Sequence, residues 1–384
     1  MPHGDAITLA EFARGEHVMT VCNACRYCEQ YCPVFPAMEE RTVFGKADLT
    51  YLANLCHNCG ECLYACQFAP PHEFGINVPQ TLARIRLHSY EEHCWPRPLG
   101  AAFRQHGVAT ALGLMGVLSV VMFASVRAFN PSGLRATSGQ FYAVVPHGAM
   151  VSLFGGVGLF VLVALAIGLR RFNAAMRADV ASSGEPHRRS DSPSGADVWR
   201  ALRDALTLRH LHSTGLDCTS SEEARYPWRR WFHHATLYGF ALCFASTSVA
   251  ALYHVVFGWH APYAYTSIPV VLGTLGGVGL LIGPAGLAVV RRSRDPELGD
   301  VAQKGMDESF ILLLWLTSLT GLALLVLREH STMSALLIVH LGAVLALFIT
   351  LPYGKFVHGI YRTAALVKYA GEMHSESHDR PRSG

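Results

Sequence analysis

Eight cysteines near the amino terminus are the residues that indicate a specific chemistry most clearly. They form the pattern C-x2-C-x2-C-x3-C twice: Cys22, Cys25, Cys28 and Cys32, then Cys56, Cys59, Cys62 and Cys66. Three thiolates at this spacing can bind three corners of a cubane, while the fourth points away and in two-cluster ferredoxins binds the other cluster. The spacing therefore predicts one [4Fe-4S] cluster on Cys22, Cys25, Cys28 and Cys66, and a second on Cys56, Cys59, Cys62 and Cys32.

Zinc is the alternative metal for such a pattern. Paired C-x2-C units also occur in zinc sites, where four ligands in two pairs surround one ion. Here each run offers four cysteines at one fixed spacing, and the whole run is repeated, which favours iron–sulfur clusters. The runs differ in one place, because Pro33 follows Cys32 whereas Gln67 follows Cys66. This departs from the ferredoxin pattern without removing a ligand.

The composition indicates that much of the chain lies in a membrane. The 384 residues are 51% hydrophobic and only 15% charged, and the mean hydropathy is positive, outside the usual range of soluble proteins. Thiolate ligands require a reducing compartment, so residues 1–100 are expected to form a cytoplasmic, two-cluster, ferredoxin-like domain. No signal peptide is expected, because residues 1–20 contain charges and no apolar segment.

Long apolar runs begin at residue 107, and each is near the ~20 residues that a helix needs to cross a bilayer. The predicted fold class is therefore an α-helical membrane protein, a six-helix transmembrane bundle with an N-terminal two-[4Fe-4S] ferredoxin-like domain. The six crossings are expected at about residues 107–127, 146–169, 232–257, 268–290, 309–327 and 333–352. The corresponding segments are transmembrane helices 1–2 in 101–170, a loop in 171–231, helices 3–6 in 232–360, and a tail in 361–384.

The placement of basic residues predicts the orientation. With the amino terminus inside, the inner loops and the tail hold twenty Lys and Arg residues, whereas the outer loops hold three. Because cytoplasmic loops collect Lys and Arg, we expect a multi-pass protein of the bacterial inner (cytoplasmic) membrane with both termini, the 171–231 loop and the 361–384 tail in the cytoplasm.

The large inner loop has two parts. Residues 181–197 consist mainly of Ser, Gly, Pro and charged residues, which predicts a disordered linker. Residues 198–211 place Trp199, Leu202 and Leu206 among arginines. This pattern predicts either an interfacial helix on the membrane or an ordinary helix packed on the soluble domain.

Histidines in spanning helices are functional candidates, since polar groups there are costly. On one continuous sixth helix, His340 and His358 would share a face about 27 Å apart, and on the third helix His233 and His254 return to within about 60° of one face. This layout predicts two bis-histidine haems b stacked across the membrane, with His147 competing with His254 for the outer position. The alternative is that these histidines are structural and the bundle only anchors the clusters.

Histidines of the soluble part have a simpler expectation. His57 and His72 are predicted to be surface groups, although His57, which lies between cluster ligands in the sequence, could instead tune a cluster potential.

These parts in this order predict an electron path from a soluble donor, through clusters and haem, to a lipid-soluble quinone. The sequence contains no G-x-G-x-x-G opening a strand–helix unit, no P-loop and no H-E-x-x-H motif. We therefore expect no site for an organic substrate in this chain. A flavin or nicotinamide site is expected on a partner protein.

Three stretches resemble the tricarballylate-utilisation protein B (CitB/TcuB) family of membrane iron–sulfur electron carriers. They are the twin cysteine runs, RRWFHHATLYGFALCFAST at 229–247 and LPYGKFVHGIYR at 351–362, and the likeness covers nearly the whole chain. The sixth crossing is also similar to haem-binding subunits of nitrate and heterodisulfide reductases. The resemblance implies that the protein reoxidises the reduced FAD of a tricarballylate dehydrogenase and reduces quinone. The alternatives are another donor, such as a heterodisulfide- or lactate-type oxidoreductase, or a membrane redox sensor.

Overall fold

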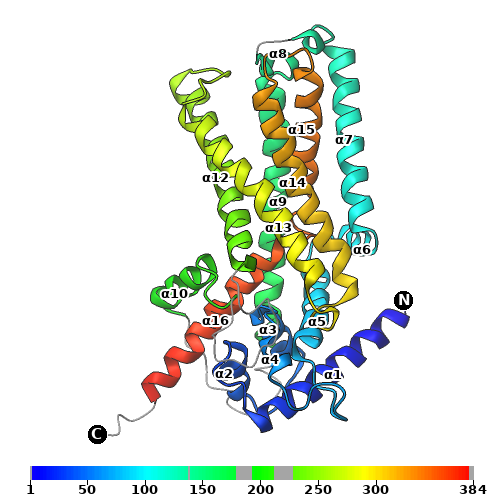
Figure 1. The fold of residues 1–384 in the computed structure, drawn as a ribbon, viewed down its shortest axis with the longest axis vertical. Helices are drawn as coiled ribbons and strands as arrows, with labels where there is room; N and C mark the ends of the chain where they lie inside the picture. The colour runs from blue at the N-terminus through cyan, green and yellow to red at the C-terminus, as the bar shows by residue number, and fades with distance from the viewer. Residues whose placement is uncertain (1, 137–138, 179–192, 212–227, 380–384) are drawn as a thin grey trace.

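The computed structural model describes residues 2–136, 139–178, 193–211 and 228–379. The molecule is elongated, with α7, α9, α12, α14 and α15 at one end and α1, α2, α3 and α4 at the other (Figure 1). Six helices in the described residues are long and apolar enough to cross a membrane, which confirms the predicted fold class. They are α7 (Gly107–Phe129), α9 (His147–Ala175), α12 (Trp228–Phe257), α13 (Ile268–Ser293), α14 (Lys304–Val326) and α15 (Met333–Thr350).

Two groups of helices make up the bundle. Helix α15 packs against α7, α9 and α14, while α12 and α13 form a hairpin joined to the rest through α14. Glycine brings α12 and α13 close together: a Cβ atom at Gly283 would lie 2.6 Å from the backbone nitrogen of Thr236 and 2.8 Å from the carbonyl oxygen of Phe232. Small residues at such crossings are typical of membrane helices, which gain stability from close packing.

Helices α1 to α5 form the amino-terminal domain, whose core is continuous with that of the bundle. Its core is buried between α1 (Pro2–Cys25), α3 (Lys46–Leu55) and α5 (Val78–His93), with α2 (Val34–Glu39) and α4 (Glu61–Tyr64) beside them. Helix α5 begins where its sequence dictates, because the Asn77 side chain accepts a hydrogen bond from the backbone nitrogen of Gln80 and Pro79 occupies the first turn. The side chains of Met19, Leu52, Leu82 and Ile85 have no solvent exposure.

Helix α16 (Val357–Asp379) connects the bundle to this domain. It packs along α3 and α10 (Gly195–Leu206), and α6 (Arg97–Gln105) makes the other connection. The Glu372 carboxylate of α16 pairs with Arg41 at 2.7 Å and accepts a hydrogen bond from the Tyr51 hydroxyl at 2.9 Å. Residues 361–379, expected to be a tail, are thus a helix docked on the ferredoxin-like domain.

Helix α10 covers most of residues 198–211, the segment of the inner loop that was predicted to be helical. A capping box between Ser194 and Asp197 begins it. One face packs on α16, while Trp199 and Leu206 remain 70% and 50% exposed, so the helix has features of both expected kinds. Residues 179–192, most of the predicted disordered linker, lie outside the described residues.

Candidate functional site

The two cysteine runs lie in turns that begin where helices end. The first run starts in the last turn of α1 and continues through a turn in which Arg26 has a positive φ of 54°. The second starts at Cys56, directly after α3, and passes through Asn58 and Gly60, with φ of 53° and 99°. These left-handed residues reverse the chain sharply, which lets consecutive cysteines face one space.

The structure groups the eight thiols in two sets of four. Burial, followed by the neighbouring thiols Cys66, Cys28 and Cys25, raises the pKa of Cys22 to about 12. Burial, followed by Cys59 and Cys56, raises the pKa of Cys32 well above its ordinary value. Each run's fourth cysteine therefore lies among the first three of the other run, the grouping in which ferredoxins hold two clusters.

The first set surrounds a cavity whose lining suits a cluster. Its volume is about 240 Å³, and thiols share its wall with the apolar side chains of Val21, Phe35, Phe68 and Ile76. Zinc would instead draw four ligands to about 2.0–2.3 Å from one ion. Among the residues that the structure describes, no three His, Cys, Asp or Glu side chains are arranged to hold a single ion. The donor set fits iron–sulfur clusters, which supply one-electron carriers when bound.

Four arginines hold the backbone at the start of the second run. Arg86 Nη1 donates to the carbonyl oxygen of Cys56 at 2.6 Å, and Arg362 Nη2 donates to the same oxygen at 2.9 Å. Arg229 Nη1 and Arg294 Nη2 donate to the carbonyl oxygen of Asn58 at 2.9 and 2.8 Å. These arginines come from α5, α16, α12 and the segment after α13, so the second cluster site is attached to the membrane helices. We call these four residues the arginine clamp.

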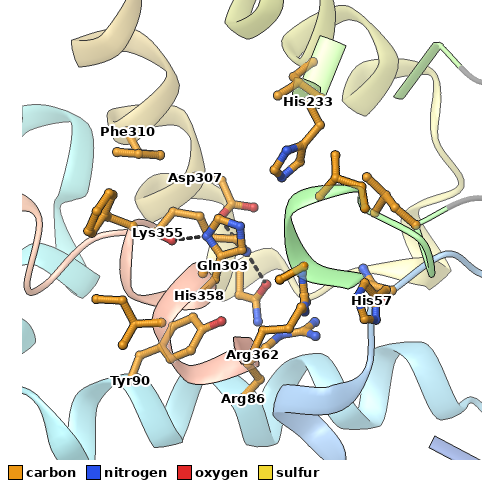
Figure 2. A pocket seen from close by; sticks show the side chains of 18 of the residues that line it. His57, Arg86, Tyr90, His233, Gln303, Asp307, Phe310, Lys355, His358 and Arg362 are labelled. Atoms are coloured by element: carbon orange, nitrogen blue, oxygen red, sulfur yellow. Dashed lines mark hydrogen bonds and ion pairs between the residues drawn. The ribbon is translucent and has the colours of Figure 1, made fainter. Parts of the chain in front are cut away.

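A cavity of about 1560 Å³ lies at this junction. It is lined by His57 and Asn58 of the second run and by residues of α5, α9, α12, α13, α14 and α16. Two of the predicted haem ligands, His233 and His358, face it (Figure 2). Their ring centroids are 5.9 Å apart and the rings are inclined by 73°.

His233 and His358 fit a metal-bound group. The His358 Nδ1 atom is hydrogen-bonded to the carbonyl oxygen of Lys355, and metal-binding histidines commonly donate one ring N–H to such an oxygen while the other nitrogen binds the metal. His233 Nδ1 is buried and has no hydrogen-bond partner among the described residues. His233 and His358 would therefore be the residues that hold such a group, and their ring separation of 5.9 Å is compatible with a metal bound by both. Haem b would supply a one-electron carrier here.

The other predicted histidines lie elsewhere. The assumption of one helix from His340 to His358 is wrong, because α15 ends at Thr350 and α16 begins at Val357. His340 packs on α14, where its Nδ1 lies 3.0 Å from the Thr320 hydroxyl and its ring touches Gly321.

At the far end of the bundle, His147 and His254 stack face to face with ring centroids 3.8 Å apart, and His260 lies 3.0 Å from His254. The two residues expected to compete for the outer position therefore contact each other, and their use as haem ligands stays a prediction.

The prediction that His57 is a surface group is also wrong. Its side chain is 5% exposed, lines the large cavity, and packs edge-on against His210 at 5.6 Å. Burial, followed by Arg362 and His210, lowers the pKa of His57 well below its ordinary value. The ring is therefore neutral at pH 7. His72 is exposed, as expected.

Sequence reasoning missed the arginine clamp. The sequence did contain a hint of these contacts, because Arg229 and Arg362 fall within residues 229–247 and 351–362, two of the stretches on which the family resemblance rests. Their charges entered the sequence argument only as evidence for orientation.

Comparison with known proteins identifies the family. Two family models match, "Citrate utilization protein B" over residues 104–379 and "Citrate utilization protein B Fer4-like domain" over residues 15–92. The Escherichia coli protein named "Citrate utilization protein B" is 48% identical over 367 residues, covering 94% of this chain and 92% of that protein. No solved structure matches the chain. The chain therefore belongs to the Citrate utilization protein B family, whose ferredoxin-like domain and membrane helices indicate electron transfer at a membrane.

Proposed function

We propose that this protein carries electrons from the reduced FAD of a partner dehydrogenase, through two [4Fe-4S] clusters and haem b, to membrane quinone. The partner oxidises a tricarboxylate. The name of the Escherichia coli relative refers to citrate, and the resemblance to the CitB/TcuB family implies tricarballylate. In this proposal the ferredoxin-like domain faces the cytoplasm, an orientation supported by the unequal distribution of Lys and Arg between the loops on the two sides of the membrane.

One observation carries the proposal: residues between ligands of the second cluster and the histidine pair line the same cavity. Cys56 and Cys59 flank His57 and Asn58, which form part of its wall together with His233 and His358. An electron that reaches the second cluster is thus beside the site that fits haem.

The protein's own residues hold this route together. The arginine clamp fixes the Cys56–Asn58 backbone against α5, α12 and α16, and the Lys355 carbonyl oxygen orients the His358 ring. Both sets of contacts keep the metal centres at fixed separations, which electron transfer requires.

The first cluster is the entry point. Tyr27, which lines the cavity beside its ligands, is 63% exposed, whereas Cys56 of the second set is buried. A flavoprotein can approach this side, while the second cluster faces the bundle.

A reduced-minus-oxidised spectrum of the purified protein, with iron and haem quantified per chain, tests the proposal. We expect about eight irons per chain, as two cubanes require, and haem b bands that disappear when a quinone analogue is added to the reduced protein. A wild-type protein with clusters that never pass electrons to quinone would refute the proposal. Incubation with purified tricarballylate dehydrogenase and tricarballylate tests the donor, because only a true partner reduces the clusters.

A further inference from the structure

The large cavity has room for more than a haem. Sites for one ligand usually enclose about 300–1,000 Å³, and this cavity measures about 1560 Å³. Residues of α14 and of the segment before α16 also line this cavity, and the assignment above gives their side chains no role in binding a cluster or haem.

A group of charged and polar side chains marks this part of the cavity (Figure 2). Lys355 Nζ lies 2.9 Å from Asp307 Oδ1 and 3.5 Å from Gln303 Oε1, and Arg291 Nη1 lies 3.0 Å from Asp307 Oδ2. Lys355 and Asp307 are only 24% and 19% exposed. Two cations and one carboxylate leave a net positive charge, which favours an electron-rich ligand with oxygen acceptors.

Aromatic and aliphatic side chains adjoin this group. Phe356 lies 6.4 Å from Phe310 and 5.9 Å from Phe240, measured between ring centroids. Ile311 and Leu314 continue the apolar wall along α14. Because α12 and α14 are membrane-spanning candidates, a ligand with a long apolar tail can place its tail in the bilayer while its ring reaches Lys355.

We propose that this part of the cavity binds the ring of a quinone, with the Lys355 ammonium donating a hydrogen bond to one ring carbonyl and Phe310 and Phe356 packing beside the ring. The assignment rests on the proposed function, which it extends by naming the site. Asp307 and Gln303 position the Lys355 ammonium. Reduction of the quinone to quinol takes two electrons from the metal centres and two protons from water on the side of the ferredoxin-like domain.

The test uses the full-length purified protein, reduced with dithionite and mixed with decylubiquinone. Cluster reoxidation is followed by absorbance over a range of quinone concentrations. We expect Lys355→Gln to raise the concentration that gives the half-maximal rate by about tenfold or more, since a hydrogen bond from a charged donor is lost. Reoxidation by ferricyanide, which needs no quinone site, should be unchanged.

A matched control and a second variant complete the experiment. Glu308 is the neighbour of Asp307 on α14 but is 46% exposed and pairs with Lys304, so Glu308→Gln should behave as wild type. Ile311→Trp should occupy space in the cavity beside the apolar wall and also slow the reaction with decylubiquinone. If Lys355→Gln loses its clusters, Ile311→Trp provides the test.

The outcomes separate the two proposals. Suppose that quinone reoxidises the wild-type protein, and that Lys355→Gln and Ile311→Trp both reach the half-maximal rate at the wild-type quinone concentration. This result would overturn the proposed site but not the proposed function. Failure of quinone to reoxidise the wild type would overturn the proposed function and the site together.

Discussion

Replacement of Arg362 by glutamine should lower the reduction potential of the second cluster selectively. Arg362 donates to the Cys56 carbonyl oxygen at 2.9 Å, next to a ligand of that cluster. Burial, together with Arg86, lowers the pKa of Arg362 to about 10, so the side chain remains charged at pH 7. A reduced cluster is more negative than an oxidised one, so a nearby positive charge stabilises the reduced state.

The size of the effect follows from Coulomb's law. A unit charge about 8 Å from the cluster, with an effective dielectric constant of about 20, contributes about 2 kcal/mol. For a one-electron couple this corresponds to about 90 mV, since 59 mV is a tenfold change in the equilibrium constant. Glutamine can keep the hydrogen bond to Cys56, so the substitution removes the charge and largely retains the contact.

The assay is a redox titration monitored by electron paramagnetic resonance, which resolves the two clusters. Arg362→Lys should keep the potential near the wild-type value, because the charge remains. Arg135→Gln, at an exposed position on the opposite end of the bundle, is the control for a change of net charge. A shift below about 20 mV, or equal shifts in both clusters, would show that the arginine clamp does not act electrostatically on the second cluster.

Three further outcomes are expected. Cys66→Ala should abolish the signal of the cluster on the first run, and damage confined to the second run would contradict the cross-ligation. His358→Ala should remove haem b bands, because the His358 ring faces that of His233 across the large cavity. Burial lowers the pKa of His93, so stability should fall as pH drops below about 6.5, the unfolded value. His93→Phe should flatten that dependence in thermal unfolding, and an unchanged slope would exclude His93 as its source.

The grouping of cysteines within each run and the membrane-spanning candidates could be predicted from the sequence because both depend on short-range patterns. A cubane fixes the spacing of its ligands over a few residues, so Cys22 to Cys66 could be grouped without knowing the fold. A span is recognised from about 20 consecutive apolar residues, and the expected 107–127 run became Gly107–Phe129. Neither inference needed tertiary contacts.

The arginine clamp was not predictable in this way. Arg362 and Cys56 are 306 positions apart in the sequence, and no local pattern reports a contact over that distance. The burial of His57 has the same cause, since its neighbours His210 and Arg229 are more than 150 positions away in the sequence. The orientation rule counts the basic residues of the inner loops, so it gives no information on whether any of them binds a backbone carbonyl.

The break between α15 and α16 could have been predicted from the sequence, and it bears on the proposed electron route. Pro352 and Gly354 follow the last apolar turn, and proline ends a helix because it lacks an N–H group and crowds the preceding turn. The break lets α16 leave the bundle and reach the ferredoxin-like domain. His358 and Arg362 are four residues apart on α16 and so lie on one face. That face contacts the Cys56 carbonyl oxygen through Arg362 and the His233 ring through His358, so in the proposed route a single helix sets the separation between the second cluster and the haem.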